Sequence, residues 1–600
     1  MLGLAGRFVE VDLTTQLVSD FVYPKDWADA HLGGLGLCAR ILLDILPPRV
    51  DPLGAENVLA IGIGPFQGTR IAGASRNVVM AVSPVTGDVS ASFVGGYFPH
   101  ALGKSGFDGL LIKGVADSPV YVLMEAGKVF ICDASMLWGL PVLETVRWLE
   151  KEHGDVRVSC IGPGGERGVQ YACILNDTSR AAGRPGFGAV MGSKQLKAVV
   201  VRGDTPKAVF DEKRVSELRA SFAKWLMADP ATQKRKRLGT AKCIVEENDL
   251  GLLPTKNFRA GQFEHVNDVS GERLLETILQ RRDTCEGCPV SCKRAVKTSF
   301  LGQSVIPEYG GMEYETVAAF SSLCLVHDLG AVALAGQKCN ALGIDTIATG
   351  VAIAAAMEAT ERGLLSDHEG IAWGDGHAMV ELVDKIGNQE GMGALLSKGM
   401  HALEQEWGND FVLHVKGQAV PMHDVRGKKG MAISFATSPR GANHMEGLDD
   451  EMFIGSLDPT PQLGVTGEVD WQAWDRKPEL CIVYENLMAF TNSLVMCAFV
   501  SLSKAVGSFY PYDKILEMLR AITGVEYTTG DIVRIGHGNY GLMRELEERT
   551  GGTPMVARLP TRFFNRIESG PLAGEKLETR ALREAVDRYQ QMRDQTADRH

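Results

Sequence analysis

Three cysteines lie within eight residues near the middle of the chain, in the segment Asp283-Thr-Cys-Glu-Gly-Cys-Pro-Val-Ser-Cys-Lys293. The spacing Cys285-x2-Cys288-x3-Cys292 supplies three thiolates, whereas a tetrahedral metal site needs four ligands. Zinc sites usually draw their ligands as two pairs, and no second pair follows this segment. Three cysteines in one loop with a remote fourth are typical of an iron–sulfur cluster. The spacing therefore favours iron–sulfur over zinc, and either metal over cysteines that bind none.

The fourth ligand has to come from another part of the chain. The downstream candidates are Cys324, Cys339, Cys481 and Cys497, most of which we expect to be buried small apolar residues. Cys497 is favoured because Asn492-Ser-Leu-Val-Met-Cys497 repeats the pattern of Asn340-Ala-Leu-Gly-Ile-Asp345. Two such segments would suit a clamp around one site, although Asn and Asp also cap helix ends.

Composition limits the class of protein. Hydrophobic residues make up 45% and charged residues 23% of the 600 residues, as in soluble globular proteins. The net charge of −12 argues against a nucleic-acid-binding protein, because binding phosphates needs clustered Lys and Arg. The start of the chain does not resemble a signal peptide, and no apolar run is long enough to span a membrane. We expect a cytoplasmic enzyme with reduced cysteines.

The chain divides into regions of different texture. Residues 1–208 are predicted to be β-rich, because short apolar runs such as Val78-Val-Met-Ala-Val82 are separated by Gly and Pro turns. Residues 209–410 and 411–600 are predicted to be mainly helical. The expected class is therefore α+β, with a β-rich N-terminal domain followed by two mainly α-helical domains.

Helix boundaries are clearest around the first Asn motif. Asp328 is placed to cap a helix that runs to Leu342 and is ended by Gly343. Asp345 or Thr346 is placed to cap the next helix. The motif is thus predicted to be a turn between two helices.

Glycine is in excess, at 68 of 600 residues, where a share of about 7% is usual. The densest stretches are residues 160–168 and 180–194, and both contain Arg. Backbone N–H groups beside basic side chains bind anions, so a phosphorylated cofactor is a natural guest. Neither stretch matches a phosphate-binding loop or a dinucleotide-binding motif, and structural turns explain them equally well.

Candidate proton carriers lie in two further segments. Glu313 and Glu315 stand at the predicted start of an apolar helix, where a carboxylate usually serves the helix dipole. Such a group donates protons only if a dry pocket raises its pKa. His444 follows a glycine turn beside Arg440, which suits a site better than a core.

Together and in this order, these segments resemble the tungsten-containing aldehyde:ferredoxin oxidoreductase family over nearly the whole chain. The markers are Ser75-Arg-Asn, Gly95-Gly-Tyr, Gly106-Phe-Asp-Gly-Leu-Leu-Ile-Lys-Gly114, Gly183-Arg-Pro-Gly-Phe-Gly-Ala-Val-Met-Gly-Ser-Lys194, the three-cysteine loop, Glu313-Tyr-Glu, Cys339-Asn-Ala-Leu-Gly-Ile-Asp-Thr346 and Arg440-Gly-Ala-Asn-His444.

The resemblance implies a tungsten bis-molybdopterin cofactor, with molybdenum as the other possible metal, on a base formed by residues 1–208. It implies that residues 209–410 carry the cluster loop and the first pterin motif. Residues 411–600 would carry the second pterin motif and the fourth cluster cysteine. One [4Fe–4S] cluster would be bound by Cys285, Cys288, Cys292 and Cys497, and Mg²⁺ would bridge the pterin phosphates.

The resemblance also implies site residues. Glu313 and His444 would handle protons, and Arg76 would lie between cluster and cofactor. The remaining expected cofactor contacts are Phe93, Gly95, Gly96, Gly183, Arg184, Asn340, Gly343, Ile344, Asp345, Asn492 and Met496.

The implied reaction is oxidation of an aldehyde to a carboxylic acid, with electrons passing to ferredoxin or to a dedicated iron–sulfur subunit. The alternative within the family is the catalytic subunit of a class II benzoyl-coenzyme A reductase acting on an acyl-CoA. A third hypothesis is a non-catalytic protein with structural zinc. A homodimer or a hetero-oligomer is expected, without nucleic acid.

Five positions depart from the family pattern. Asn340 and Asn492 stand where its pterin motifs begin with Asp, which keeps an acceptor oxygen but removes the charge. Val495 and Pro185 stand at positions where the family usually has Gly. Phe93 replaces an Asn found in some members, a tolerable change if the contact there uses the backbone carbonyl.

Overall fold

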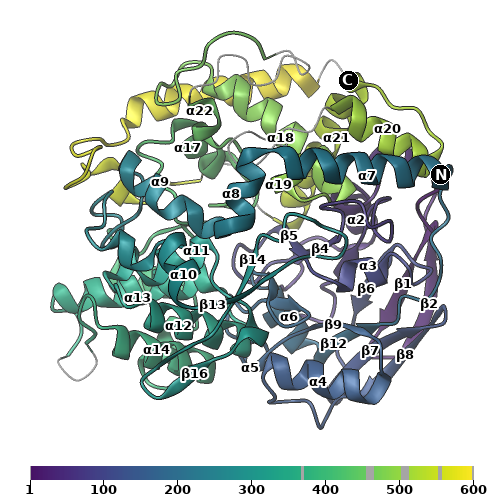
Figure 1. The fold of residues 1–600 in the computed structure, drawn as a ribbon, viewed down its shortest axis with the longest axis horizontal. Coiled ribbons are helices and arrows are strands. Elements are labelled where there is room, and N and C mark those ends of the chain that lie inside the picture. The colour runs from purple at the N-terminus through teal and green to yellow at the C-terminus, as the bar shows by residue number, and fades with distance from the viewer. Residues whose placement is uncertain (1, 367–369, 455–464, 502–511, 552–556, 598–600) are drawn as a thin grey trace.

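The computed structural model describes residues 2–366, 370–454, 465–501, 512–551 and 557–597. Two six-stranded sheets occupy the N-terminal third, and helices predominate from Glu212 onward (Figure 1). The predicted α+β class, with a β-rich N-terminal part before a mainly helical remainder, is confirmed. No helix in the described ranges combines the length and apolar character that crossing a membrane requires.

The first sheet has the strand order β2-β1-β6-β3-β4-β5. Strands β1 and β6 are parallel and the other neighbours are antiparallel. Its central strands are buried throughout, which explains their unbroken apolar runs. The bounds are β1 (Arg7–Asp12), β2 (Leu17–Val22), β3 (Leu59–Gly62), β4 (Arg76–Val82), β5 (Val89–Gly95) and β6 (Gly109–Lys113).

The second sheet has the order β11-β10-β9-β12-β7-β8, and only β7 and β12 are parallel. One apolar core lies between the two sheets, and further cores pack the outer faces against helices. The bounds are β7 (Val120–Glu125), β8 (Lys128–Asp133), β9 (Arg157–Cys160), β10 (Ile174–Asn176), β11 (Arg180–Ala182) and β12 (Leu196–Val201). The helices of this region are α1 (Lys25–His31), α2 (Gly34–Ile45), α3 (Phe98–Leu102), α4 (Val142–His153), α5 (Pro163–Glu166) and α6 (Phe187–Ser193).

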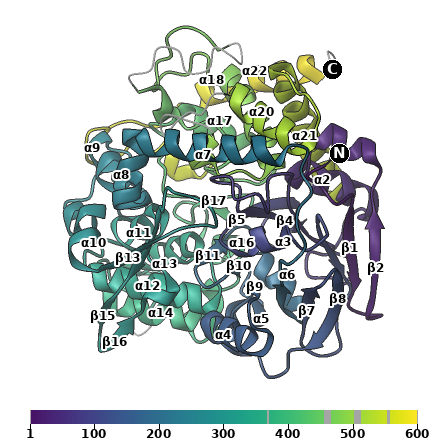
Figure 2. The same ribbon diagram turned by 45° about the vertical axis from the view of Figure 1, so that its right-hand side comes forward.

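In Figure 2 the helical part lies to the left of the two sheets and above them. Its helices are α7 (Glu212–Ala228), α8 (Pro230–Leu238), α9 (Cys243–Leu250), α10 (Gly271–Thr277), α11 (Tyr314–Phe320), α12 (Leu329–Leu342), α13 (Thr346–Glu361), α14 (Gly376–Asn388), α15 (Met392–Leu396), α16 (Met400–Trp407), α17 (Lys429–Thr437), α18 (Lys477–Leu494), α19 (Ala498–Ser501), α20 (Tyr512–Thr523), α21 (Thr529–Thr550) and α22 (Thr579–Ala597). Three short hairpins complete it: β13 (Leu279–Asp283) with β14 (Lys293–Val296), β15 (Thr298–Phe300) with β16 (Gln303–Val305), and β17 (His414–Val415) with β18 (Gln418–Ala419).

The predicted turn between two helices is confirmed. The Asp328 side chain caps α12, and Gly343 ends that helix in the left-handed conformation. Asp345 caps α13 by accepting a hydrogen bond from the Ala348 N–H at 2.9 Å.

The end of α12 lies directly against glycines of the N-terminal region. A Cβ atom on Gly162 would come within 2.5 Å of the Leu342 backbone, and one on Gly164 within 2.9 Å of its carbonyl oxygen. The Cys173 N–H then donates to the Gly343 carbonyl at 2.8 Å. Glycine is required here because backbone meets backbone without room for a side chain.

The end of α18 is held in the same manner. Cβ atoms on Gly34 and Gly64 would come within 2.6 Å of the Asn492 oxygen and 2.8 Å of the Leu494 oxygen, respectively. The buried Gln67 amide donates to the carbonyl oxygen of Val495 at 3.0 Å. The two repeated Asn motifs are therefore both helix ends that dock on glycines of the sheet region.

Val495 takes the left-handed conformation with φ of +50°. A β-branched residue costs roughly 1–2 kcal/mol in this conformation, which a glycine adopts without strain. The backbone at Val495 is therefore strained, and the surrounding contacts keep it in this conformation.

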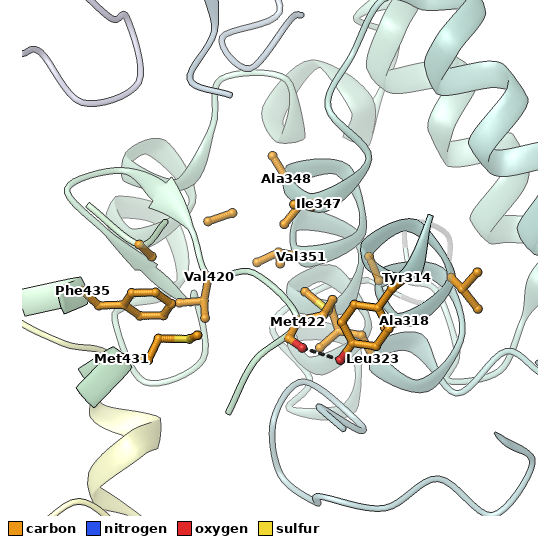
Figure 3. Close-up of a cluster of buried hydrophobic side chains, with 14 of the residues drawn as sticks. Tyr314, Ala318, Leu323, Ile347, Ala348, Val351, Val420, Met422, Met431 and Phe435 are labelled. Carbon is orange, nitrogen blue, oxygen red and sulfur yellow. Dashed lines mark hydrogen bonds between the residues drawn. The ribbon is translucent and has the colours of Figure 1, made fainter. Parts of the chain in front are cut away.

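A buried tyrosine ties helix α11 to the loop after β18. The Tyr314 hydroxyl donates to the Met422 carbonyl at 2.6 Å, within a cluster that includes Leu323, Val351 and Val420 (Figure 3). This contact fixes the segment that carries His423 beside the start of α11.

We expect Gly162→Ala to destabilise the protein by about 1–3 kcal/mol, because the added methyl overlaps the Leu342 backbone. The apparent unfolding temperature at one fixed scan rate would fall. Gly538→Ala in α21 is the matched control, since nothing lies within 4 Å of the added Cβ atom there. Equal unfolding temperatures for Gly162→Ala and the unsubstituted protein would contradict the docking of α12.

Candidate active site

A cavity of about 470 Å³ lies between the sheet region and the helices. Its wall combines the ends of β4 and β5, the β13–β14 hairpin, the start of α11, the α12–α13 turn and the segment after α18. Eleven residues expected from the sequence line it: Arg76, Phe93, Gly95, Cys285, Cys292, Glu313, Asn340, Ile344, Asp345, His444 and Cys497.

The other expected residues lie outside this lining. Gly183 and Arg184 line a small second cavity that shares Asp345 with the large one. Gly96, Cys288, Gly343, Asn492 and Met496 belong to the same loops and helix ends but do not line the cavity wall.

The four expected cysteines come together from two distant segments. Cys285, Cys288 and Cys292 lie in the loop between β13 and β14, and the Cys497 N–H donates to the Gly73 carbonyl at 2.9 Å. Burial, together with the neighbouring Cys285 and Cys497, raises the pKa of Cys288 to about 12. Burial likewise raises the pKa of Cys292, which faces the other three thiols. Such thiols become thiolates only when a metal binds them.

The spacing of these thiols argues against a single zinc ion. A Zn–S bond of about 2.3 Å in a tetrahedron places the sulfurs about 3.8 Å apart. Among the described residues, the groups of three or more potential ligands whose atoms all lie within 4.8 Å contain no cysteine. The four thiols therefore suit a larger centre than one metal ion.

Glu313 forms an ion pair with Lys293 instead of pairing with His444. Its carboxylate lies 2.7 Å from the Lys293 ammonium and accepts a hydrogen bond from the Thr240 hydroxyl. Burial raises the pKa of Glu313, but Lys293 and Thr240 outweigh it and lower that pKa below its usual value. The geometry does not support the expected pairing of Glu313 with His444.

Glu315 is the carboxylate that contacts His444. Its Oε1 atom lies 3.5 Å from His444 Nε2 and 3.1 Å from His423 Nε2, and its Oε2 accepts the Met422 N–H at 2.9 Å. Burial raises the pKa of Glu315, but the two imidazoles and this N–H lower it to about 2. Burial lowers the pKa of His444 to about 4. At neutral pH the pair is a carboxylate beside a neutral imidazole.

The first Asn motif presents polar groups to the cavity. The Asn340 side-chain amide donates to the Tyr309 carbonyl at 2.9 Å. Burial raises the pKa of Asp345 to about 6, against the opposing charge of Arg184. The Arg76 guanidinium donates to the Phe93 carbonyl at 2.9 Å, so this contact at position 93 uses the backbone.

Several buried guanidinium groups near the cavity have N–H donors that make no hydrogen bond within the described residues. Arg184 Nη1, Arg180 Nε and Arg235 Nε make no hydrogen bond within the described part of the chain. A buried guanidinium N–H without an acceptor raises the free energy of the folded state. We therefore expect these groups to bind an anionic ligand with several acceptor atoms.

The sequence did not single out Arg180, Arg235, Lys242, Glu247 or His423, which all line the cavity. Arg180 begins the glycine-dense stretch 180–194, whereas the other four lie in segments without a recognisable motif, and folding alone brings those four to the wall. Glu315 is also a candidate proton carrier from the sequence, where nothing separates it from Glu313. The contacts of Glu315 with His423 and His444 distinguish the two residues.

Two family models match the chain. The model described as "Aldehyde ferredoxin oxidoreductase, N-terminal domain" matches residues 8–203. The model described as "Aldehyde ferredoxin oxidoreductase, domains 2 & 3" matches residues 217–598.

Curated relatives and a solved structure agree with these models. Tungsten-containing aldehyde ferredoxin oxidoreductases of Thermococcus kodakarensis and Pyrococcus furiosus are each 33% identical to this chain, over 100% of it and 97% of their own length. The WOR-like subunit of an aliphatic sulfonate oxidoreductase of Pyrococcus furiosus is 29% identical, over 98% of this chain and 94% of that protein.

The active-site complex of a benzoyl-coenzyme A reductase, solved with 1,5-dienoyl-CoA, has the same fold, with a TM-score of 0.84 and 24% identity. The match covers 99% of this chain and 94% of that one. Because both family models and full-length relatives match in register, the chain belongs to the aldehyde ferredoxin oxidoreductase family of oxidoreductases.

Proposed function

We propose that this protein oxidises aldehydes to carboxylic acids at a tungsten bis-pterin centre and passes the electrons through a [4Fe–4S] cluster. The proposal is supported by one observation: the same cavity is lined by cysteines on one side and by a carboxylate–imidazole pair on another. One side brings together Cys285, Cys292 and Cys497, and another presents Glu315 with His444. Redox centres and proton acceptors on the same buried space are what this oxidation requires.

The residues present fit the proposed cofactor. The buried N–H groups of Arg180, Arg184 and Arg235 lack acceptors within the described chain, which suits anionic pterin phosphates. When bound, the metal centre supplies Lewis acidity and accepts two electrons. We propose that the cofactor and its Mg²⁺ are held by Arg76, Phe93, Gly95, Gly96, Gly183, Arg184, Asn340, Gly343, Ile344, Asp345, Asn492 and Met496.

The cluster is proposed on Cys285, Cys288, Cys292 and Cys497. The spacing of their thiols supports a multi-iron cluster, and the described residues form no disulfide, which suits the cytoplasm as the compartment. The proposed electron acceptor is ferredoxin or a dedicated iron–sulfur subunit, in a homodimer or a hetero-oligomer.

We propose that Glu315, in place of Glu313, works with His444 on protons. Neutral His444 can take a proton from the reacting oxygen, and the adjacent carboxylate stabilises the imidazolium that forms. Glu313 instead neutralises Lys293, which follows the last cysteine of the cluster loop.

An aldehyde is favoured over a coenzyme A ester by the basic residues of the wall. Arg180 pairs with Asp283, Lys242 with Glu246 and Lys293 with Glu313. Arg235 stacks on the Phe499 ring. Because the unpartnered N–H groups of Arg180 and Arg235 are assigned to the pterin phosphates and the two lysines are paired, the described wall offers few further charges to the phosphates of a coenzyme A arm. The benzoyl-coenzyme A reductase activity is therefore the second candidate.

Anaerobically purified protein should contain about four irons and one tungsten per chain and should reduce a viologen dye with aldehydes. Cys497→Ser should lose most of the iron, because one of four thiolate ligands is removed. Cys324→Ser is the control, since the hydrogen bonds of that buried thiol go to the backbone carbonyls of Ala319 and Gly350, away from the other cysteines. One zinc without iron, or dye reduction with aromatic acyl-CoA but not with aldehydes, would contradict the proposal.

Glu315→Gln should lower kcat/KM for an aldehyde by about 100-fold, because the imidazolium of His444 loses its counter-charge. Glu313→Gln is the matched control and should lower it far less, provided tungsten and iron contents stay equal. A larger loss for Glu313→Gln than for Glu315→Gln would restore Glu313 as the proton carrier.

The acid limb of kcat/KM should reflect the lowered pKa of His444. The rate should stay flat as pH falls through 6.5 and should decline only near pH 4, where the imidazole becomes protonated. The same shift makes acid destabilise the fold, because between pH 6.5 and 4 the unfolded His binds a proton that the folded one does not. A decline centred near pH 6.5 would show that His444 is not buried as described.

A further inference from the structure

Behind the cavity wall lies a lysine that the proposed chemistry does not yet use. Lys428 directly precedes α17 and is fully buried. Its Nζ atom lies 2.9 Å from His423 Nδ1 and 3.1 Å from Glu247 Oε1, and it also pairs with Glu451 and Asp449. A buried ion pair adds little stability compared with well-packed apolar residues. Stability alone therefore does not explain why these charges are buried beside the proposed active site.

The contacts of Lys428 decide the proton positions on His423. Burial lowers the pKa of Lys428, but Asp449, Glu247 and Glu451 outweigh it and hold that pKa well above its usual value. A lysine ammonium has donors and no acceptor, so it must donate to His423 Nδ1. A neutral imidazole that accepts at Nδ1 carries its hydrogen on Nε2.

The same logic continues to the cavity. His423 Nε2 lies 3.1 Å from Glu315 Oε1, a buried oxygen that makes no well-aligned hydrogen bond among the described residues, so the tautomer with its hydrogen on Nε2 is the one that this carboxylate favours. An ionised carboxylate only accepts hydrogen bonds, so His444 must also present an N–H to it from Nε2, at 3.5 Å. The lone pair of His444 is then on Nδ1, which is buried and has no hydrogen-bond partner within the described residues.

We propose that Lys428 is a positioning residue that fixes the donor order Lys428 to His423 to Glu315, with His444 donating to Glu315 from the other side. His444 Nδ1 is thereby left as the atom that takes a proton from the substrate. This inference rests on the proposed aldehyde oxidation, in which aldehyde and water give a carboxylic acid, two electrons and two protons. The electrons go to the redox centres, one proton goes to His444 Nδ1 and the other is released to solvent water; His444 acts as in a Ser-His-Asp triad with Glu315 in the place of Asp.

Other charged groups face this chain of contacts. Arg184 and Asp449 act on His444, Glu247 lies 3.7 Å from His423 Nδ1, and Glu451 hydrogen-bonds to Glu247. If Lys428 lost its charge, His423 would move its hydrogen to Nδ1 to face these carboxylates. Its bare Nε2 would then repel ionised Glu315.

The direct test is the tautomer of both histidines in full-length, oxidised protein labelled with 15N-histidine. Long-range 1H–15N spectra, assigned with His423→Gln and His444→Gln, should show the Nε2–H form for both residues. Lys428→Met should convert His423 to the Nδ1–H form, and Lys428→Arg should keep the original form. An Nδ1–H form of His423 in the unsubstituted protein overturns the proposal, and this spectrum decides even if Lys428→Met does not fold.

Kinetics supply the second readout. Lys428→Met should lower kcat about 100-fold with little change in KM, and Lys428→Arg should restore most of it. Lys197→Met is the matched control, because Lys197 is equally buried and pairs with Glu166 in the sheet region. It should leave kcat and the His423 tautomer unchanged, and an equal kcat loss in both Met variants overturns the role of Lys428.

The two proposals fail separately. Nε2–H forms in a protein that does not oxidise aldehydes would retain the donor order and remove the proposed function. Aldehyde oxidation with an Nδ1–H form of His423 would retain the function and remove the role of Lys428.

Discussion

The site depends on the close approach of two helix ends to the backbone of the sheet region. Helices α12 and α18 end against Gly162 and Gly34, where a Cβ atom would meet main-chain atoms at 2.5 and 2.6 Å. Backbone hydrogen bonds from Cys173 and Cys497 then join the two regions. Because Asp345 and Cys497 follow these helix ends by only a few residues, the docking sets where both side chains meet the cavity.

The cavity wall also separates charge into distinct environments. Glu313 and Glu315 are two residues apart, yet one pairs with a lysine and the other lies between two imidazoles. Burial raises the pKa of a carboxyl, and in both cases neighbouring groups more than offset it. Different partners thus place two carboxylates that are two residues apart in different electrostatic environments.

The structure shows what the side chain or backbone does at two positions that depart from the family pattern, Asn340 and Val495. The Asn340 amide donates to the Tyr309 carbonyl, a bond that an ionised aspartate could not form because it has no donor. Val495 holds a left-handed conformation that glycine would take without strain, and Gln67 binds its carbonyl. Both positions thus keep the backbone path of the motif while changing its side chains.

The sequence by itself determined the α+β class, the capped α12–α13 turn and the family, because local patterns and ordered motifs carry that information. It also pointed to Cys497 through the repeated Asn motif. Only the tertiary structure decided that Glu315 contacts His444, and that Lys428 and His423 stand behind them. The reason is physical: Glu313 and Glu315 are only two residues apart and share one local sequence pattern, whereas His423 and His444 come from segments more than 100 positions further along the chain, which only folding brings close to Glu315.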